Sequence, residues 1–267
     1  MSKANPAASR NSGRRHQLLT WSIGSVLSVL GLWAGVSNLG LVDPNLLPTP
    51  QSMVTETMAL LKNGYQGQSL WSHIWASLFR TLTGFAVGAV LGTPLGLLSG
   101  FSRVMGAIFS PLMAFIRPIP PIAFIPMAVL YFGLGETGKI VLIAFTAFNY
   151  AFINAQAGAA HVPTAYYRAA ASMGLTKLQI LLRIVLVAAV PQIFTGLKVA
   201  MALSWAVVVA AELVGAQVGL GFMISDAAQL FRIPVVFIGV ALIGIIGLIL
   251  NGTLTGMENR FVHWKGR

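Results

Sequence analysis

Few side chains in this sequence have the types and spacing that catalysis or metal binding requires. The four histidines, His16, His73, His161 and His263, lie far apart along the chain and show no metal-ligand spacing. The sequence has no cysteine, which excludes disulfides, thiolate metal sites and cysteine nucleophiles. The acidic residues avoid the middle of every apolar run, so the sequence offers no polar cluster for a membrane-embedded enzyme or a proton relay.

One glycine-rich stretch approaches a nucleotide-binding motif. Residues 133–140 read GLGETGKI, and a phosphate-binding loop needs Ser or Thr after the lysine to hold magnesium. Ile140 occupies that position, and the stretch joins two apolar runs. We therefore interpret it as a tight turn and expect no nucleotide site in this chain.

A cation stands among prolines inside another apolar run, in the sequence Arg117-Pro118-Ile119-Pro120-Pro121. Proline removes a backbone donor and clashes with the preceding turn, so a continuous helix is not expected here. A cation near the midplane of a bilayer is costly and by default indicates function. Arg117 either meets an anionic substrate or binds carbonyls that the prolines free, and we favour the structural role.

Composition places these groups in an all-α integral membrane protein. Of 267 residues, 56% are hydrophobic and only 9% charged, against about 25% charged in a typical soluble domain. We expect one six-span transmembrane domain at 18–256 between basic tails at 1–17 and 257–267, with a short amphipathic helix at 52–61. Six apolar runs are each near the ~20 residues that cross a bilayer, and they lie at 18–36, 75–100, 107–133, 138–158, 188–212 and 233–255.

The net charge of +11 follows membrane topology rather than a nucleic-acid partner. With the N-terminus inside, the inner segments hold eleven Lys and Arg against a single acid, Glu258, and the outer segments hold three against five acids. Both termini and the polar stretch at 161–187 are therefore predicted on the cytoplasmic side of the cell inner membrane. Within the spans, Arg80 and Lys198 lie near the ends and are expected to snorkel to the interface.

The second apolar run carries glycine at every fourth position. That spacing puts the glycines on one helix face, where missing side chains let another backbone approach closely. We favour a tight helix interface, within the chain or between subunits, over the simpler view that membrane helices are rich in glycine. The residues of this row are Gly84, Gly88, Gly92 and Gly96, with Gly100 after them.

The stretch at 161–187, HVPTAYYRAAASMGLTKLQILLRIVLV, is the one long polar interruption between spans. Thr164 is expected to cap a first short helix, and Gly174 can take the left-handed conformation that ends it. Thr176 then begins a capping box with Gln179, which predicts a second short helix. We hypothesise that another protein docks on this pair of helices.

This stretch resembles the cytoplasmic EAA loop of ABC-importer permeases, in which Glu-Ala-Ala is followed by three residues, a Gly, nine residues and Ile-x-Leu-Pro. The sequence departs from that pattern at two places, with Arg168 at the Glu position and Val187 at the Pro position. The positions that match in register are Ala169, Ala170, Gly174, Ile184 and Leu186.

Other stretches are similar to the nitrate, sulfonate and taurine branch of these permeases, so the resemblance covers the chain from about residue 18. They are Leu47–Pro50, Arg117–Pro121, Tyr131–Glu136, Ala211–Glu212 and Gly219–Gly221.

The resemblance implies a type I ABC-importer permease with six spans and a cytoplasmic coupling-helix hairpin, in which two copies line the pathway as a homodimer. A periplasmic binding protein would deliver substrate, and separate ATPase subunits would bind ATP and Mg, so this chain would hold no cofactor and catalyse no reaction. The residues expected to contact the ATPase are Tyr166, Tyr167, Arg168, Ala169, Ala170 and Gly174. Those expected along the substrate pathway are Arg117, Pro118, Pro120 and Pro121.

The implied cargo is a small anion, taurine or another alkanesulfonate first, with nitrate, bicarbonate or an aromatic carboxylate as alternatives. An ion-coupled secondary carrier is the remote alternative, and it would transport without an ATPase.

Overall fold

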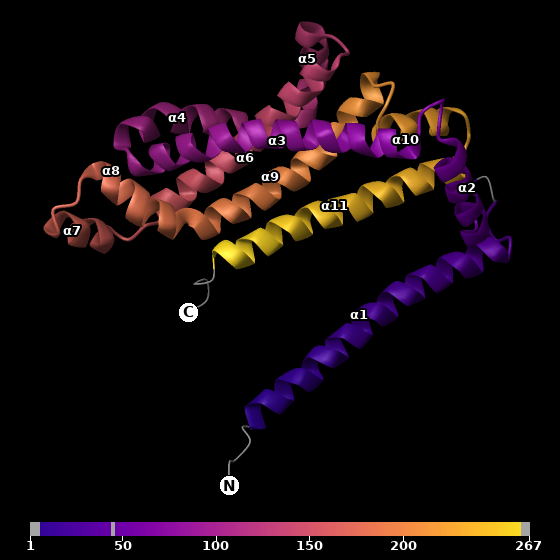
Figure 1. The fold of residues 1–267 in the computed structure, drawn as a ribbon, viewed down its shortest axis with the longest axis horizontal. Coiled ribbons are helices and arrows are strands. Elements are labelled where there is room, and N and C mark those ends of the chain that lie inside the picture. The colour runs from indigo at the N-terminus through magenta and orange to yellow at the C-terminus, as the bar shows by residue number, and fades with distance from the viewer. Residues whose placement is uncertain (1–5, 44–45, 263–267) are drawn as a thin grey trace.

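The computed structural model describes residues 6–43 and 46–262, and every regular element within them is a helix. Helices α3, α6, α9 and α11 run alongside one another and define the long axis of the molecule (Figure 1). A 3₁₀ turn η1 (Pro121–Phe124) precedes α5, and a π turn η2 (Leu181–Val185) joins α8 to α9. In chain order the helices are α1 (Pro6–Asn38), α2 (Pro50–Asn63), α3 (Leu70–Phe101), α4 (Arg103–Ile116), α5 (Ile125–Phe132), α6 (Glu136–Ala160), α7 (Thr164–Ser172), α8 (Lys177–Ile180), α9 (Leu186–Gly215), α10 (Leu220–Gln229) and α11 (Ile233–Phe261).

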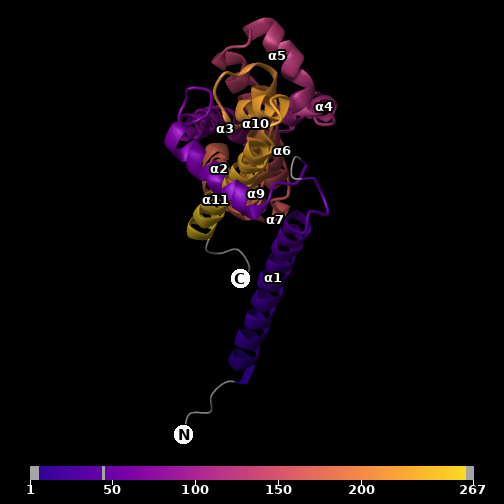
Figure 2. The same cartoon turned by 90° about the vertical axis from the view of Figure 1, so that its right-hand side faces the viewer.

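The bundle has two distinct ends. Helices α7 and α8 lie together at one end, here called the α7 end, and α2 and α10 lie at the other, the α10 end (Figure 1). Figure 2 views the same molecule from the α10 end. The α10 helix was not predicted, because its ten residues are too few to show as an apolar run.

The described residues support four or five membrane spans where the sequence predicts six. Four helical segments are long and apolar enough to cross a bilayer, and they are Leu70–Phe101, Glu136–Ala160, Lys177–Gly215 and Ile233–Phe261. The pair Arg103–Ile116 and Pro121–Phe132 makes a fifth if it is counted as one bent span. The predicted run at 18–36 falls in α1, where the apolar part with described side chains, Ile23–Asn38, is shorter.

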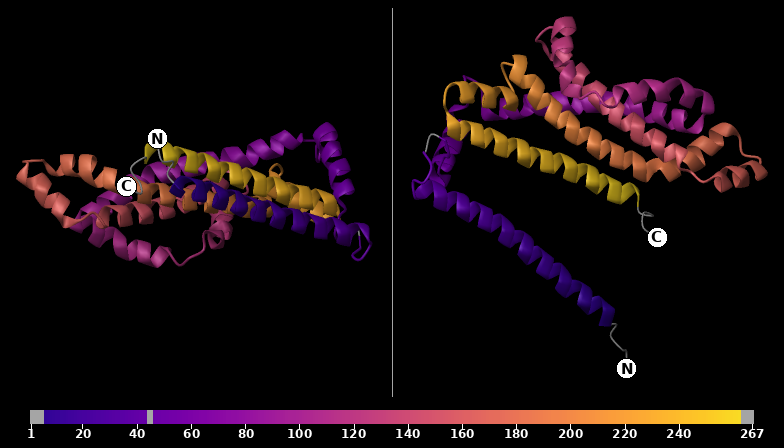
Figure 3. Two further views of the ribbon diagram at one scale, coloured as in Figure 1. Left: turned by 90° about the horizontal axis from the view of Figure 1, so that it is seen from below. Right: turned by 180° about the vertical axis from the view of Figure 1, so that it is seen from behind.

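Helix α1 lies apart from the bundle. It begins at Pro6, so the predicted basic tail at 1–17 continues without a break into the first apolar run. Views from the front (Figure 1), from the α10 end (Figure 2) and from behind (Figure 3, right) all show α1 leaving the other helices. The chain ends differ from the predicted domain limits too, because α11 extends past residue 256 to Phe261. Residues 1–5 and 263–267 of the two predicted tails lie outside the described residues.

The predicted interruption of the third run is present and has the expected cause. Helix α4 ends at Ile116, and three prolines within the next five residues prevent its last carbonyls from finding donors in a continuing helix. The chain resumes as η1 and α5 at an angle of 86° to α4, and α5 projects from the side of the bundle (Figure 1).

The glycine row of α3 lies directly against α6. A Cβ atom on Gly88 would lie 2.3 Å from the carbonyl oxygen of Ala144, and one on Gly92 would lie 2.5 Å from that of Phe148. These separations are far below normal van der Waals contact, so only glycine permits the two backbones to lie this close. The structure therefore places the row at an interface inside the chain.

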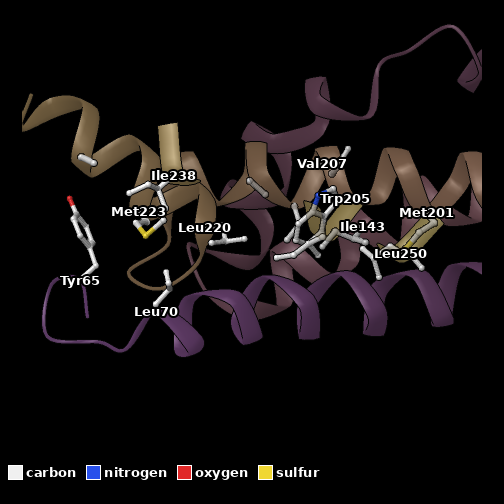
Figure 4. Close-up of a cluster of buried hydrophobic side chains, with 14 of the residues drawn as sticks. Tyr65, Leu70, Ile143, Met201, Trp205, Val207, Leu220, Met223, Ile238 and Leu250 are labelled. Carbon is white, nitrogen blue, oxygen red and sulfur yellow. The ribbon is translucent and has the colours of Figure 1, made fainter. Parts of the chain in front are cut away.

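Two buried apolar clusters fill the bundle. The larger occupies its middle and the α10 end, where Trp205, Leu220 and Met223 lie among side chains of α3, α6, α9 and α11 (Figure 4). The smaller lies at the α7 end and includes Ala155 of α6 and Val185 of η2. Each end of the bundle, the α7 end and the α10 end, therefore packs on its own apolar cluster.

We predict that Gly92→Ala destabilises the protein, while Gly252→Ala, whose Cβ would meet no atom within 4 Å, does not. Alanine normally stabilises a helix by about 1 kcal/mol relative to glycine. Overpacking against Phe148 opposes that gain by about 1–3 kcal/mol. Melting temperatures of the two purified variants in detergent test this, and equal melting temperatures would contradict the packing argument.

Candidate functional site

The polar stretch folds into a compact element at the α7 end. Pro163 is the N-cap of α7, and Thr164, expected to cap it, is instead the first helical residue and makes no cap bond. Gly174 follows the helix with φ of +74°, in the left-handed region that favours glycine. Thr176 and Gln179 form the predicted capping box, with both reciprocal bonds present.

The second short helix is the end of a much longer one. From Lys177 the chain stays helical through α8, η2 and α9 to Gly215, a total of 39 residues. At 1.5 Å per residue this rod is roughly 58 Å long, about twice the ~30 Å hydrocarbon core of a bilayer. Part of the rod must therefore stand outside the hydrocarbon, and α7 is attached to one of its ends.

Two predicted contact residues fasten α7 to the bundle instead of facing outward. Ala170 is 2% exposed and belongs to the smaller apolar cluster. The ring of Tyr167 stacks on Phe101 at the end of α3, with 6.2 Å between centroids, and burial raises the pKa of its hydroxyl. These contacts attach α7 to the end of α3 and to the smaller apolar cluster.

The opposite face of this element is exposed and mixes apolar with basic side chains. Tyr166, Arg168, Ala169 and Gly174 are exposed, as a docking surface requires. Sequence reasoning missed three further apolar residues on the same element, although an apolar side chain within a polar stretch was a usable signal. They are Met173, Leu178 and Leu182, each more than half exposed.

Arg117 lies at the bend between α4 and η1, where Pro118, Pro120 and Pro121 shape the chain. Its side chain is exposed and makes no hydrogen bond or ion pair with the residues whose side chains the structure describes, 20–21, 23–43 and 46–262. The carbonyl contacts that we favoured from the sequence are thus absent from this part of the chain. The guanidinium is left free to meet a group from outside.

The cations expected to snorkel are paired instead. Lys198 of α9 donates to Glu258 of α11 at 2.6 Å. Arg80 is only 5% exposed and uses both sides of its guanidinium at the α10 end. One side donates to Glu212 at 2.6 Å, and the other donates to Glu136 at 2.7 Å.

Glu212 and its neighbours bind the backbone at the start of α10. The Glu212 carboxylate accepts from the N–H of Gly221 at 2.9 Å and from the hydroxyl of Ser77 at 2.8 Å. Ser77 also accepts from the N–H of Leu220, and His73 accepts from that of Gly219. The first free N–H groups of α10 are thus satisfied by side chains of α3 and α9. The resemblance marked Ala211–Glu212 and Gly219–Gly221, but the contacts that join them to each other and to α3 were not predicted, because α3 lies in a distant segment of the sequence.

Neither end of the bundle holds a metal site among the side chains that the structure describes, those of 20–21, 23–43 and 46–262. No three His, Asp or Glu side chains gather there as metal ligands would. The charged cluster around Arg80 is instead internally satisfied, and its chemistry is structural.

Arg80→Met should destabilise the protein strongly, and Glu136→Gln only weakly. Removing Arg80 leaves the buried carboxylate of Glu212 without its cation, a loss of about 3–5 kcal/mol. The side chain of Glu136 is 56% exposed, so water compensates and the loss is below about 1 kcal/mol. Thermal unfolding in detergent measures both, and similar melting temperatures for the two variants would refute the ranking.

Comparison with known proteins identifies the class of this bundle. Residues 92–263 match the family described as binding-protein-dependent transport system inner membrane component. The chain is 36% identical to the taurine transport system permease protein TauC of Escherichia coli, over 93% of this chain and 90% of that one. It is 34% identical to the bicarbonate transport system permease protein CmpB of Synechococcus elongatus, over 97% and 95%.

The fold is also that of a solved transporter. An inward-facing structure of the MetNI methionine ABC transporter matches with a TM-score of 0.65 and 21% identity, over 77% of this chain and 98% of that chain. The chain belongs to the family of binding-protein-dependent transport system inner membrane components, the permease subunits of ABC transporters.

Proposed function

We propose that this permease imports a small anion, taurine or another alkanesulfonate, with energy from a separate ATPase that grips the α7 end. The observation that carries the proposal is the two-sided α7 element. One side is fixed to the bundle through Ala170 and Tyr167, and the other exposes Tyr166, Met173 and apolar side chains of the adjoining rod. Exposed apolar groups on a segment outside the hydrocarbon favour a protein partner.

The α7 end faces the cytoplasm in this proposal, and both termini lie on that side of the cell inner membrane. Basic residues concentrate at the α7 end, which the positive-inside rule assigns to the cytoplasmic side, and acidic residues occur at the α10 end. The α7-end bases include Arg103, Arg168, Lys177 and Arg183, and the α10-end acids include Asp43, Glu56 and Asp226. This orientation presents the exposed face of α7 to cytoplasmic ATP-binding subunits.

Coupling then follows from rigid attachment. The ATPase dimer closes on ATP and displaces α7, and the 39-residue rod carries that displacement into the bundle. A second copy of the chain completes the pathway. This is supported by the exposed apolar side chains of α1, α4 and α5, among them Leu32, Phe115 and Leu130, which the single chain leaves uncovered.

Arg117 is the residue proposed to meet the substrate. Its free guanidinium at the bend can hydrogen-bond two oxygens of a sulfonate or a carboxylate at once. The similarity to TauC favours taurine. Bicarbonate is the second candidate, supported by the similarity to CmpB. Nitrate and aromatic carboxylates carry the same charge and fit the same argument about Arg117.

Gly174→Val should abolish ATP-driven uptake while the protein still inserts into the membrane. A β-branched residue resists φ of +74°, at a cost above the roughly 1–2 kcal/mol of an ordinary left-handed residue, so the angle between α7 and the rod changes. Gly174→Asn is the control, because asparagine tolerates this conformation. Uptake is measured in proteoliposomes with the ATPase and the binding protein. Normal uptake by the valine variant would contradict the proposed coupling through α7 and the rod.

Arg117→Gln should raise the taurine concentration needed for half-maximal uptake by about 10–100-fold. A hydrogen bond to a charged group is worth about 1.5–3 kcal/mol, and each 1.4 kcal/mol is about tenfold. Arg117→Lys, which keeps the charge, should lose less. If the glutamine variant keeps both wild-type uptake and wild-type substrate-stimulated ATP hydrolysis, Arg117 does not contact the substrate.

The same reconstitution separates an importer from a secondary carrier. Uptake of labelled taurine is compared with and without the ATPase, under an imposed proton or sodium gradient. Transport by the purified permease alone would overturn the proposed function.

A further inference from the structure

The α10 end carries two backbone conformations that side chains rarely adopt. Among residues 6–43 and 46–262, only Gln66 and Phe231 have positive φ without being glycine, at 49° and 54°. For a bulky residue such as Phe this is an outlier, and it persists only where the surroundings impose it. The two residues belong to different loops, Gln66 before α3 and Phe231 between α10 and α11.

One carboxylate joins these two loops. Asp226 of α10 accepts from the amide of Gln66 at 2.9 Å and from the hydroxyl of Tyr65 at 2.8 Å. Burial is the larger cause, and the hydrogen bond to Asp226 the second, of a raised pKa at Tyr65. The hydroxyl therefore stays protonated and remains a donor. The first loop is thereby fixed to the helix that leads into the second.

The α10–α11 turn is held from several directions. Arg232 donates its backbone N–H to the carbonyl of Ala227 at 2.8 Å. Its guanidinium lies 5.3 Å from the ring centroid of Tyr65 and pairs with Glu56 of α2 at 2.5 Å. These contacts over-determine the backbone immediately around Phe231.

The strained conformation does not serve to bury the aromatic ring. Phe231 is 85% exposed, the largest fraction among the exposed large hydrophobic residues of the described chain, and Leu230 beside it is 53% exposed. Folding gains nothing from an apolar ring in water. A rigid turn that holds an exposed ring in a strained backbone conformation is therefore a candidate site for binding another molecule.

We propose that Phe231 is the anchor with which this permease docks its extracytoplasmic binding protein, an inference that rests on the proposed function and orientation. The ring is apolar, and the turn that carries it is held by contacts of the charged residues Arg232, Glu56 and Asp226. An aromatic centre with a polar rim is the usual arrangement of a binding hot spot. Contact with lipid would not require this backbone, since α11 exposes Leu248 and Ile249 from an ordinary helix.

The test uses the complete transporter, permease with ATPase, in lipid nanodiscs. Its extracytoplasmic binding protein, loaded with taurine, is titrated against it. Phe231→Ala should raise the concentration for half-maximal stimulation of ATP hydrolysis at least tenfold, with stimulation returning at saturating concentration. Phe231→Asn, which tolerates the left-handed backbone but lacks the ring, should behave alike, and Phe231→Trp should bind nearly as wild type. Leu248→Ala removes an equally apolar, 74% exposed side chain from α11 and should change nothing.

The outcomes separate this inference from the proposed function. If the wild-type complex gains no ATPase activity from the binding protein, the proposed function fails. If the wild type responds and both Phe231→Ala and Phe231→Asn titrate like it, the anchor is refuted. If those two variants keep their affinity but melt differently in nanodiscs and in detergent, the ring lies in lipid and the proposal is likewise overturned.

Discussion

The close approach of α3 to α6 is the contact on which the rest of this structure depends. Inside a bilayer, helices gain little from hydrophobic burial, so association relies on van der Waals contact and hydrogen bonds between them. Gly88 and Gly92 allow that contact by leaving room for carbonyls of α6. The same face of α3 continues, at helical spacing, into Ser77 and His73, which bind the start of α10. A single helix face therefore holds the centre and one end of the bundle.

The two ends are built by different physics. At the α10 end, polar groups meet inside the protein, and Arg80 is held between two acids while Glu212 binds backbone donors. At the α7 end, apolar side chains such as Ala170 attach a small helix, and basic groups remain outside. The first arrangement is rigid because leaving a buried charge unpaired is costly. The second is suited to transmit movement, because a helix fixed on one side can be pushed from the other.

Local signals predicted the structure well where one segment decides it. The prolines after Arg117 predicted the bend, and Thr176 with Gln179 predicted the capping box. Prediction failed where the decisive partner lies far away in the chain. Arg80 looked like a snorkelling cation because Glu136 and Glu212 are 56 and 132 residues distant. The burial of Ala170 could not be predicted for the same reason, since its neighbours in the cluster come from other helices.

The π turn at Leu181–Val185 sets the angular phase between the two parts of the long rod. A π turn takes in about one residue more than an α turn, and one residue corresponds to a rotation of about 100° around a helix axis. The faces of α8 and α9 are therefore out of register by a fixed angle. A deletion of one residue here would shorten the rod by only about 1.5 Å and turn the exposed side of α7 and α8 toward a different direction. The direction in which the exposed side of α7 and α8 faces is thus set by the number of residues in this turn.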